Sequence, residues 1–186
     1  ELDFDCETYP NPSQDAGPFL VARRHESDDL PTVMTYGHGD VVAGYDGQWD
    51  NDMNPWKITK RDNRWYGRGT ADNKGQHTIN LGALKSVLDT RESLGFNVIL
   101  LIEMGEERGS PGLKDFCAQH KDLFQADVFI ASDGPRIHPD KPTIFMGSRG
   151  VFNFIMRLNV HDGGHHSGNW GGLLTNPGVV MAHALA

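Results

Sequence analysis

The segment Val98-Ile99-Leu100-Leu101-Ile102 is apolar at every position and constrains the fold more than any other part of the sequence. A strand with one solvent-facing side alternates apolar and polar residues, whereas a short uninterrupted apolar run is typical of a strand covered on both faces. Residues 127–131, apolar after Asp127, predict a second buried strand, and apolar residues recur at helical spacing between Lys74 and Thr90. Because strands and helices alternate, we predict an α/β fold with a largely parallel sheet and helices on both faces.

Local signals predict further elements. Residues 1–18 are polar and rich in turn-forming residues, which predicts a loop. Asn176 followed by Pro177 is typical of a helix start. The remaining predicted elements are strands at 19–22 and 32–36, a hairpin at 56–66 that turns at Asp62-Asn63, and helices at 111–120 and 177–186.

The pattern changes after Pro142, where alternating apolar residues predict strands of the antiparallel type at 143–146 and 151–160. We therefore expect a first domain at 1–148 and the beginning of a second, α+β domain at 149–186. The sequence stops within the helix predicted from residue 177, so we expect it to be a piece of a longer chain.

The charge balance excludes several classes of partner. Acidic residues outnumber basic ones by 25 to 17, the net charge is -8, and no run of Lys and Arg occurs. We therefore predict that neither nucleic acid nor a membrane is a partner, and the longest apolar run is too short to span a bilayer. Because the chain has only two cysteines, Cys6 and Cys117, we expect a reducing compartment and a cytoplasmic protein.

Acidic and imidazole side chains gather where the predicted strands finish. In parallel α/β sheets, ligands bind beyond the carboxyl ends of the strands, so these side chains are expected to converge. One imidazole with several carboxylates suits a divalent cation, zinc first, with manganese or cobalt as alternatives. The residues are His38 and Asp40 after strand 32–36, Glu106 and Glu107 after strand 98–102, Asp133 after strand 127–131, and Asp72 in a glycine-rich loop before the helix at 74–90.

The spacing within these groups adds detail, and each group also has a simpler explanation. Asp40 lies two residues after His38, where its carboxylate can accept the spare ring N–H, although such pairs also occur by chance. In the pair Glu106-Glu107, one carboxylate can bind metal while its neighbour acts as general base. The simpler interpretation of the pair is an acidic helix start, but the placement of all four acidic sites at strand ends or a helix start jointly favours a metal site. The glycine loop at 67–75 lacks the full phosphate-binding pattern.

Five segments in this order resemble the cocatalytic-zinc amidohydrolase family that includes aminoacylase, carboxypeptidase G, carnosine dipeptidase and succinyl-diaminopimelate desuccinylase. The resemblance spans residues 37–168. The segments are Gly37-His38-Gly39-Asp40-Val41-Val42, Gly67-Arg68-Gly69-Thr70-Ala71-Asp72-Asn73-Lys74-Gly75, Glu106-Glu107-Arg108-Gly109-Ser110, Ser132-Asp133-Gly134 and His166-Ser167-Gly168.

The resemblance implies a role for each matching residue. It implies a phosphorylase/hydrolase-like zinc peptidase domain with two zinc ions (cobalt or manganese as alternatives), followed by a lid that makes a homodimer. His38 and Asp133 would bind one metal, Glu107 the other, and Asp72 both. Glu106 would be the general base, Asp40 would lie behind His38, and His166 would stabilise the oxyanion. The Asp72–Asn73 peptide bond would be cis.

Other histidines receive simpler interpretations. His161 and His165 compete with His166 for the oxyanion role, but the Ser167-Gly168 context favours His166. The histidines interpreted as surface or packing residues are His25, His77, His120, His138 and His183.

Departures from the family pattern limit what this chain can do. Ala43 replaces a family proline. The resemblance implies that the family's second histidine ligand follows the lid and that its carboxylate-binding residues lie in the later part of the lid, both beyond residue 186. We therefore expect this chain alone to be inactive. The expected activity is hydrolysis of an amide bond in a peptide, a dipeptide or an N-acyl amino acid. The alternatives are a hydrolase of a non-peptide amide such as an N-carbamoyl compound, and a non-catalytic homologue that acts as a dimerisation or binding module.

Overall fold

The computed structural model describes residues 2–50, 52–134, 136–138 and 140–186. They form two compact units, residues 1–141 and residues 142–186. The division falls a few residues before the boundary that the sequence predicted after residue 148. That the second unit begins a lid domain stays a prediction, and each unit is described by itself below.

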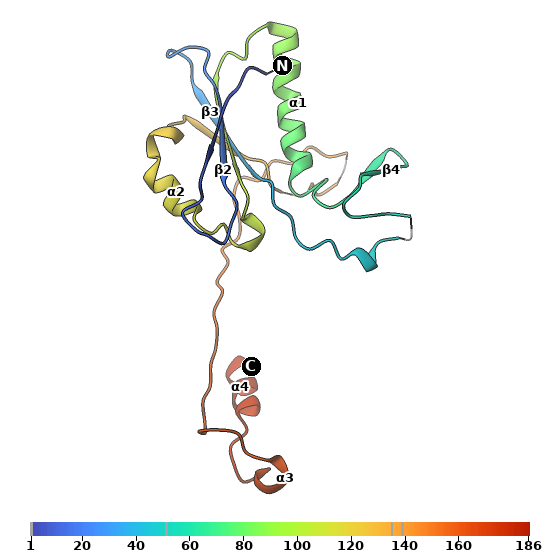
Figure 1. The fold of residues 1–186 in the computed structure, drawn as a ribbon, viewed down its shortest axis with the longest axis vertical. Coiled ribbons are helices and arrows are strands. Elements are labelled where there is room, and N and C mark those ends of the chain that lie inside the picture. The colour runs from blue at the N-terminus through green and yellow to red at the C-terminus, as the bar shows by residue number, and fades with distance from the viewer. Residues whose placement is uncertain (1, 51, 135, 139) are drawn as a thin grey trace. The chain divides into compact units, whose positions relative to one another are not determined.

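The first unit is built on a five-stranded sheet with the strand order β1-β2-β6-β3-β7. Helices α1 (Lys74–Arg91) and α2 (Leu113–Gln119) lie on opposite faces of this sheet (Figure 1). The α/β class and the helices on both faces are therefore as predicted. The strands are β1 (Asp5–Tyr9), β2 (Phe19–Arg24), β3 (Thr32–His38), β6 (Asn97–Glu103) and β7 (Val128–Ala131).

The sheet is mixed, which corrects the prediction of a largely parallel sheet. Strand β3 runs parallel to both β6 and β7, whereas β2 runs antiparallel to both β1 and β6. The apolar run of β6 indicates that both faces of the strand are covered. It does not indicate whether the neighbouring strands run parallel or antiparallel to it, and β6 has one neighbour of each kind. Strand β1 lies where the sequence predicted a loop; it is a mostly exposed edge strand, so it lacks an apolar pattern.

The core confirms the central position of β6. Its residues from Val98 to Leu101 are all buried, and Ile99 and Leu101 pack with Phe19 and Phe116. The rings of Phe19 and Phe116 are stacked with centroids 4.2 Å apart, which joins α2 to one face of the sheet. In contrast, β7 is exposed, although the sequence predicted a buried strand, because it lies at the edge of the sheet with β3 as its one neighbour.

Short elements connect this framework. The predicted hairpin is present as β4 (Thr59–Arg61) and β5 (Arg64–Tyr66), and its turn residues Asp62 and Asn63 have φ of 47° and 59°. Such left-handed pairs match the twist of a two-residue hairpin, and asparagine and aspartate tolerate them best after glycine. The described residues of this unit also form short 3₁₀ helices, namely η1 (Asp46–Gln48), η2 (Glu106–Arg108) and η3 (Lys121–Phe124).

The second unit contains α3 (Ser167–Trp170) and α4 (Pro177–Leu185). The side chain of Asn176 accepts hydrogen bonds from the backbone N–H groups of Gly178 (2.8 Å) and Val179 (3.3 Å), so the predicted helix start is confirmed. The prediction of strands at 143–146 and 151–160 is wrong, because residues 142–186 are all described and none of them lies in a strand. A strand is held by hydrogen bonds to a second strand, and no strand forms within this unit.

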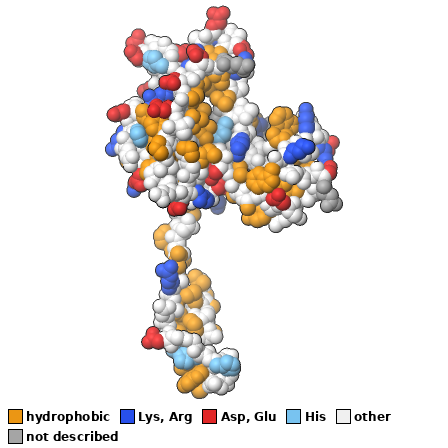
Figure 2. Space-filling model, viewed as in Figure 1, with side chains coloured by type: hydrophobic (Ala, Val, Ile, Leu, Met, Phe, Trp, Pro, Cys, Tyr) orange, Lys and Arg blue, Asp and Glu red, His pale blue; other side chains and the backbone are white. Residues whose placement is uncertain are grey.

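Apolar side chains of the second unit are consequently left at its surface (Figure 2). Phe152 and Phe154, which alternate as strand residues would, are 83% and 61% exposed. Across the part of the chain that the structure describes, no helix combines the length and the apolar character needed to cross a membrane.

Candidate metal centre

Three of the predicted ligands, His38, Asp72 and Asp133, converge beyond the carboxyl ends of the parallel strands β3 and β7. One potential ligand atom from each lies within 4.8 Å of the others. His38 Nε2 is 2.9 Å from Asp72 Oδ1 and 3.5 Å from Asp133 Oδ2. The strand register explains this, because Tyr36 of β3 pairs with Ala131 of β7 and the two ligands each follow two residues later.

These donors fit a divalent metal ion such as zinc. Zinc takes imidazole nitrogen and carboxylate oxygen at ~2.0–2.2 Å, so ligands of one ion stand ~3–4 Å apart. The distance from His38 Nε2 to Asp133 falls in that range, and the distance to Asp72, 2.9 Å, lies at its lower limit. His38 is fully buried, while the Asp72 side chain is 65% exposed, so the site is rigid on the imidazole side and open to solvent on the other.

The charges of the site also favour a cation. Burial lowers the pKa of His38, but the Asp40 carbonyl, the Asp72 carboxylate and the negative charge of Asp133 outweigh it, so that the pKa is raised overall. Burial is likewise the main cause that raises the pKa of Glu106, and the neighbouring carboxylates add to it. This concentration of negative charge around one imidazole is what a bound divalent cation would neutralise.

The pair Glu106-Glu107 lies at the beginning of η2, beside the cluster. Glu106 Oε2 is 3.7 Å from His38 Nε2, so its carboxylate reaches the same space as the candidate ligands. Glu107 donates its backbone N–H to Asp40, and its carboxylate is not part of the group of three found among the described residues. Its predicted role as ligand of a second metal stays a prediction.

Asp40 adjoins His38, and its backbone carbonyl lies closer to the ring than its carboxylate does. His38 Nδ1 is 3.1 Å from the backbone carbonyl of Asp40, whereas the Asp40 carboxylate is 3.4 Å away. Because a carbonyl oxygen only accepts hydrogen bonds, Nδ1 carries the hydrogen, and in the neutral ring Nε2 is left to bind metal. The carboxylate instead accepts the N–H groups of Glu106 and Glu107, both at 3.1 Å.

The start of α1 contributes residues that the sequence analysis missed. The peptide bond between Asp72 and Asn73 is cis, as the resemblance implied. Asn73 is fully buried and accepts the backbone N–H of His38 at 3.1 Å, and His77 Nε2 lies 2.7 Å from the His38 carbonyl. The interpretation of His77 as a surface or packing residue is therefore incomplete. Its spacing of four from Asn73, which places both on one helix face, was the available signal.

His166 belongs to the second unit, where it precedes α3. Its Nδ1 accepts the backbone N–H of Gly168 at 3.1 Å. The competing residue His161 places Nε2 3.1 Å from the carbonyl of Thr175, and its ring contacts that of His165. The predicted oxyanion role of His166 stays a prediction.

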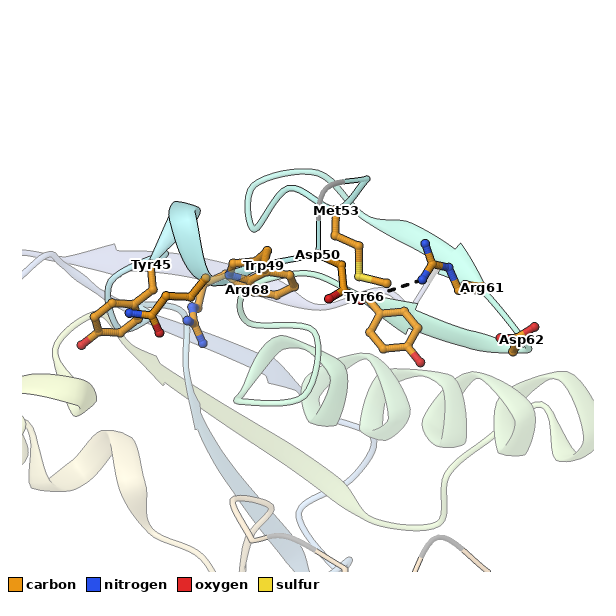
Figure 3. A pocket seen from close by; sticks show the side chains of 9 residues that line it. Tyr45, Trp49, Asp50, Met53, Arg61, Asp62, Tyr66 and Arg68 are labelled. Carbon is orange, nitrogen blue, oxygen red and sulfur yellow. Dashed lines mark ion pairs between the residues drawn. The ribbon is translucent and has the colours of Figure 1, made fainter.

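A separate open pocket of about 520 Å³ lies beside the β4–β5 hairpin (Figure 3). The Arg68 guanidinium lies over the Trp49 ring, 5.8 Å from its centroid, and bonds the Gly44 carbonyl, so it ties the preceding loop to the segment that leads to Asp72. None of the three converging candidate ligands lines this pocket. Its lining residues are Tyr45, Gln48, Trp49, Asp50, Met53, Arg61, Asp62, Tyr66 and Arg68.

Comparison with known proteins shows which family and which relatives the chain resembles. Residues 34–157 match the model of peptidase family M20/M25/M40, a range that includes all three converging ligands. The chain is 34% identical over its whole length to a cysteinylglycine-S-conjugate dipeptidase of Corynebacterium striatum, and 34% identical over 86% of its length to the Beta-Ala-His dipeptidase of Mus musculus. It spans 39% and 33% of the lengths of these two relatives.

A solved structure agrees with these sequence matches. The crystal structure of human carnosine dipeptidase 1 superposes with a TM-score of 0.70 and 26% sequence identity. The match covers 99% of this chain and 40% of that one.

Proposed function

The chain belongs to peptidase family M20/M25/M40, and on this premise we propose that it is part of a metal-dependent hydrolase of small peptides. The names of the two similar relatives, both dipeptidases, support a dipeptide as the substrate class. N-acyl amino acids are a further proposed substrate, since they offer the same amide bond. The observation that carries the proposal is the convergence of His38, Asp72 and Asp133 beside the Glu106 carboxylate.

We propose two zinc ions in the active site of the whole protein, with cobalt or manganese as substitutes. His38 and Asp133 would hold one ion, Asp72 would bind both, and Glu107 would bind the second. Such ions, when bound, polarise the substrate carbonyl and lower the pKa of water. The mixed imidazole and carboxylate donor set supports this choice of metal.

Glu106 is proposed to move the proton. A carboxylate beside the reacting carbonyl can take a proton from the attacking water and return it to the leaving amine. Its raised pKa, caused mainly by burial, makes it a stronger base than an exposed glutamate and suits both steps. His166 is proposed to donate to the oxygen of the carbonyl as negative charge develops there.

The assembly and location of the whole protein are also proposals. Residues 149–186 are proposed to begin a lid domain through which two subunits form a homodimer in the cytoplasm. The exposed apolar side chains of this segment support a role in contacts with the rest of the lid domain or with a second subunit.

Metal analysis of the intact protein, followed by a screen of dipeptides, N-acyl and N-carbamoyl amino acids, tests the function. We expect stoichiometric zinc and turnover of at least one dipeptide that a chelator abolishes. If only N-carbamoyl compounds are turned over, the substrate is a non-peptide amide and the proposed peptide substrate is wrong. Metal-free protein without hydrolytic activity would favour a non-catalytic binding module.

A further inference from the structure

Side chains from the start of α1 hold the backbone of His38 on both sides. Asn73 Oδ1 accepts the N–H of His38 at 3.1 Å, and the His38 carbonyl accepts a hydrogen bond from His77 Nε2 at 2.7 Å. Lys74 Nζ donates to the carbonyl of Gly39, also at 2.7 Å. Three side chains from the start of one helix therefore bind three backbone polar groups of His38 and Gly39, the segment that carries the candidate imidazole ligand.

The sheet explains why these groups need side-chain partners. The pairing of β3 with β7 ends at Tyr36 and Ala131, so no β7 residue is paired with His38. On the other side of the strand, Gly39 donates its N–H to the carbonyl of Glu103 in β6. Because His38 is fully buried, its N–H and carbonyl would be costly to leave unpaired, and Asn73 and His77 take the place of the missing strand.

The space beside Gly37 shows how closely His77 approaches the strand. A Cβ atom at Gly37 would lie 1.8 Å from Cε1 of His77 and 2.6 Å from Oδ1 of Asn73. Only glycine therefore fits before His38 while both side chains keep their positions. Since a carbonyl oxygen only accepts, His77 Nε2 must carry the hydrogen, and the contact is a directed hydrogen bond rather than packing alone.

Asn73 extends this hold to the second strand end. Its Nδ2 donates to the carbonyl of Ser132 at 2.9 Å, directly before Asp133, and its own chain neighbour is Asp72. One buried amide thus contacts or adjoins the segments of all three converging ligands. A shift of this side chain would move the ligands relative to one another.

We infer that His77 and Asn73 are positioning residues of the metal centre, and this inference rests on the proposed function. They set the place of the His38 ring through its backbone, without touching the metal themselves. Residues that orient a ligand in this way typically change metal affinity about 10–100-fold when they are replaced. The directed hydrogen bond from Nε2 of His77 should be the decisive contact.

Two amide substitutions in the intact protein separate this bond from packing. The side-chain nitrogen of glutamine in His77→Gln occupies the place of Nε2 and can still donate to the His38 carbonyl. In His77→Asn the amide ends one bond earlier, near the place of Nδ1, and cannot reach. His25→Asn is the matched control, because His25 is an exposed histidine whose contact is with Asp28.

Three readouts are compared: zinc affinity by chelator competition, the visible spectrum of the cobalt-loaded protein, and hydrogen exchange, without metal, of the Gly39 amide, which shares its peptide group with the His38 carbonyl. His77→Asn should weaken zinc binding about tenfold or more, alter the cobalt spectrum and speed exchange of the amide. His77→Gln and His25→Asn should resemble the parent in all three. Circular dichroism verifies that each variant is folded.

The inference is overturned if His77→Asn binds zinc as tightly as the parent, or if folded His77→Gln loses as much affinity as His77→Asn. If His77→Asn does not fold, the glutamine variant decides alone: parent-like affinity supports the inference and weak binding overturns it. A parent that binds no metal would end the proposed function instead. In that case faster exchange in His77→Asn but not in His77→Gln supports the hold on the His38 backbone, and equal exchange rules it out.

Discussion

The carboxylate of Asp40 accepts the backbone N–H of Glu107 at 3.1 Å, while the carbonyl of the same aspartate bonds the ring of His38. Asp40 also accepts the N–H of Glu106. One residue therefore connects the candidate imidazole ligand to the turn that carries the proposed general base. This double contact makes Asp40 a determinant of the geometry between the His38 ring and the turn that carries Glu106.

Asp40→Asn should weaken the connection to the turn at η2, which the side chain makes, and keep the backbone contact with His38. Asparagine offers one acceptor oxygen where the carboxylate offers two, and its NH₂ group would face a backbone N–H. We expect zinc affinity to fall about tenfold or more, measured by chelator competition, with the fold retained. Asp28→Asn, at a fully solvated side chain, is the control. Unchanged zinc affinity in Asp40→Asn would show that the turn at η2 keeps its conformation without the Asp40 carboxylate.

Glu106→Gln should abolish proton transfer while leaving metal binding in place. Loss of a general acid–base group lowers kcat about 10²–10⁴-fold. We expect a decrease in this range on a cleavable dipeptide, with KM and zinc content close to those of the parent. Asp115→Asn on the exposed side of α2 should leave kcat unchanged. Near-normal turnover in Glu106→Gln would show that another group acts as the general base.

Metal removal should destabilise the first unit. The carboxylates around His38 repel one another without a cation, so a metal that binds only the folded state stabilises it. Zinc at about 100 times its Kd should add about 2.7 kcal/mol to the free energy of unfolding. Thermal unfolding with zinc and with a chelator measures this change. The effect should be lost in Asp133→Asn, and an equal Tm in both conditions would contradict a site at this cluster.

Glu26 gives a pH-dependent contribution to stability far from the site. The backbone N–H of Leu94 is the main cause that lowers its pKa from 4.5, and Gly95 and Arg24 lower it further. A carboxyl with a lowered pKa stabilises the fold above its ordinary pKa, and this contribution is lost as the pH falls through the lowered value.

Glu26→Gln should therefore cost about 1–2 kcal/mol of unfolding free energy at neutral pH. The difference from the parent should vanish below the lowered pKa, where both side chains are neutral. Urea unfolding at the two pH values measures this, with the exposed Glu92→Gln as control. A difference that stays constant with pH would assign the effect to packing rather than to charge.

The two cysteines should differ in reactivity. Burial, together with the negative charge of Glu103, raises the pKa of the Cys117 thiol, whereas Cys6 is exposed in β1. Because the thiolate is the reactive form, iodoacetamide should alkylate Cys6 well before Cys117 in the folded protein. Mass spectrometry of timed samples follows both sites, and denaturant should make the rates equal. Equal rates in the folded state would mean that α2 opens readily.

Elements defined by local signals could be predicted closely. The apolar run predicted β6, the helical spacing predicted α1, and the Asn176-Pro177 pair predicted the start of α4. Two polar residues predicted the turn of the hairpin at Asp62-Asn63. Each of these signals lies within a few residues of the element that it specifies, so no knowledge of the rest of the chain was needed.

Elements that depend on a partner could not be predicted in the same way. β7 reads as a buried strand but is exposed, because its position at the edge of the sheet is decided by which strands pair. Strand β1 has no apolar pattern and forms because β2 supplies its hydrogen bonds. Residues 151–160 alternate as a strand should, yet stay unpaired within the second unit.

The sequence by itself determined which residues can form the candidate centre, because His38 and Asp133 follow predicted strands and Asp72 precedes a predicted helix. The tertiary structure decided how they are held. The contacts of Asn73 with His38 and Ser132, and of Asp40 with the turn at Glu106, join segments that lie dozens of residues apart. Periodicity and capping describe neighbours along the chain, whereas a hydrogen bond between distant segments depends on the packing of the whole sheet and its helices.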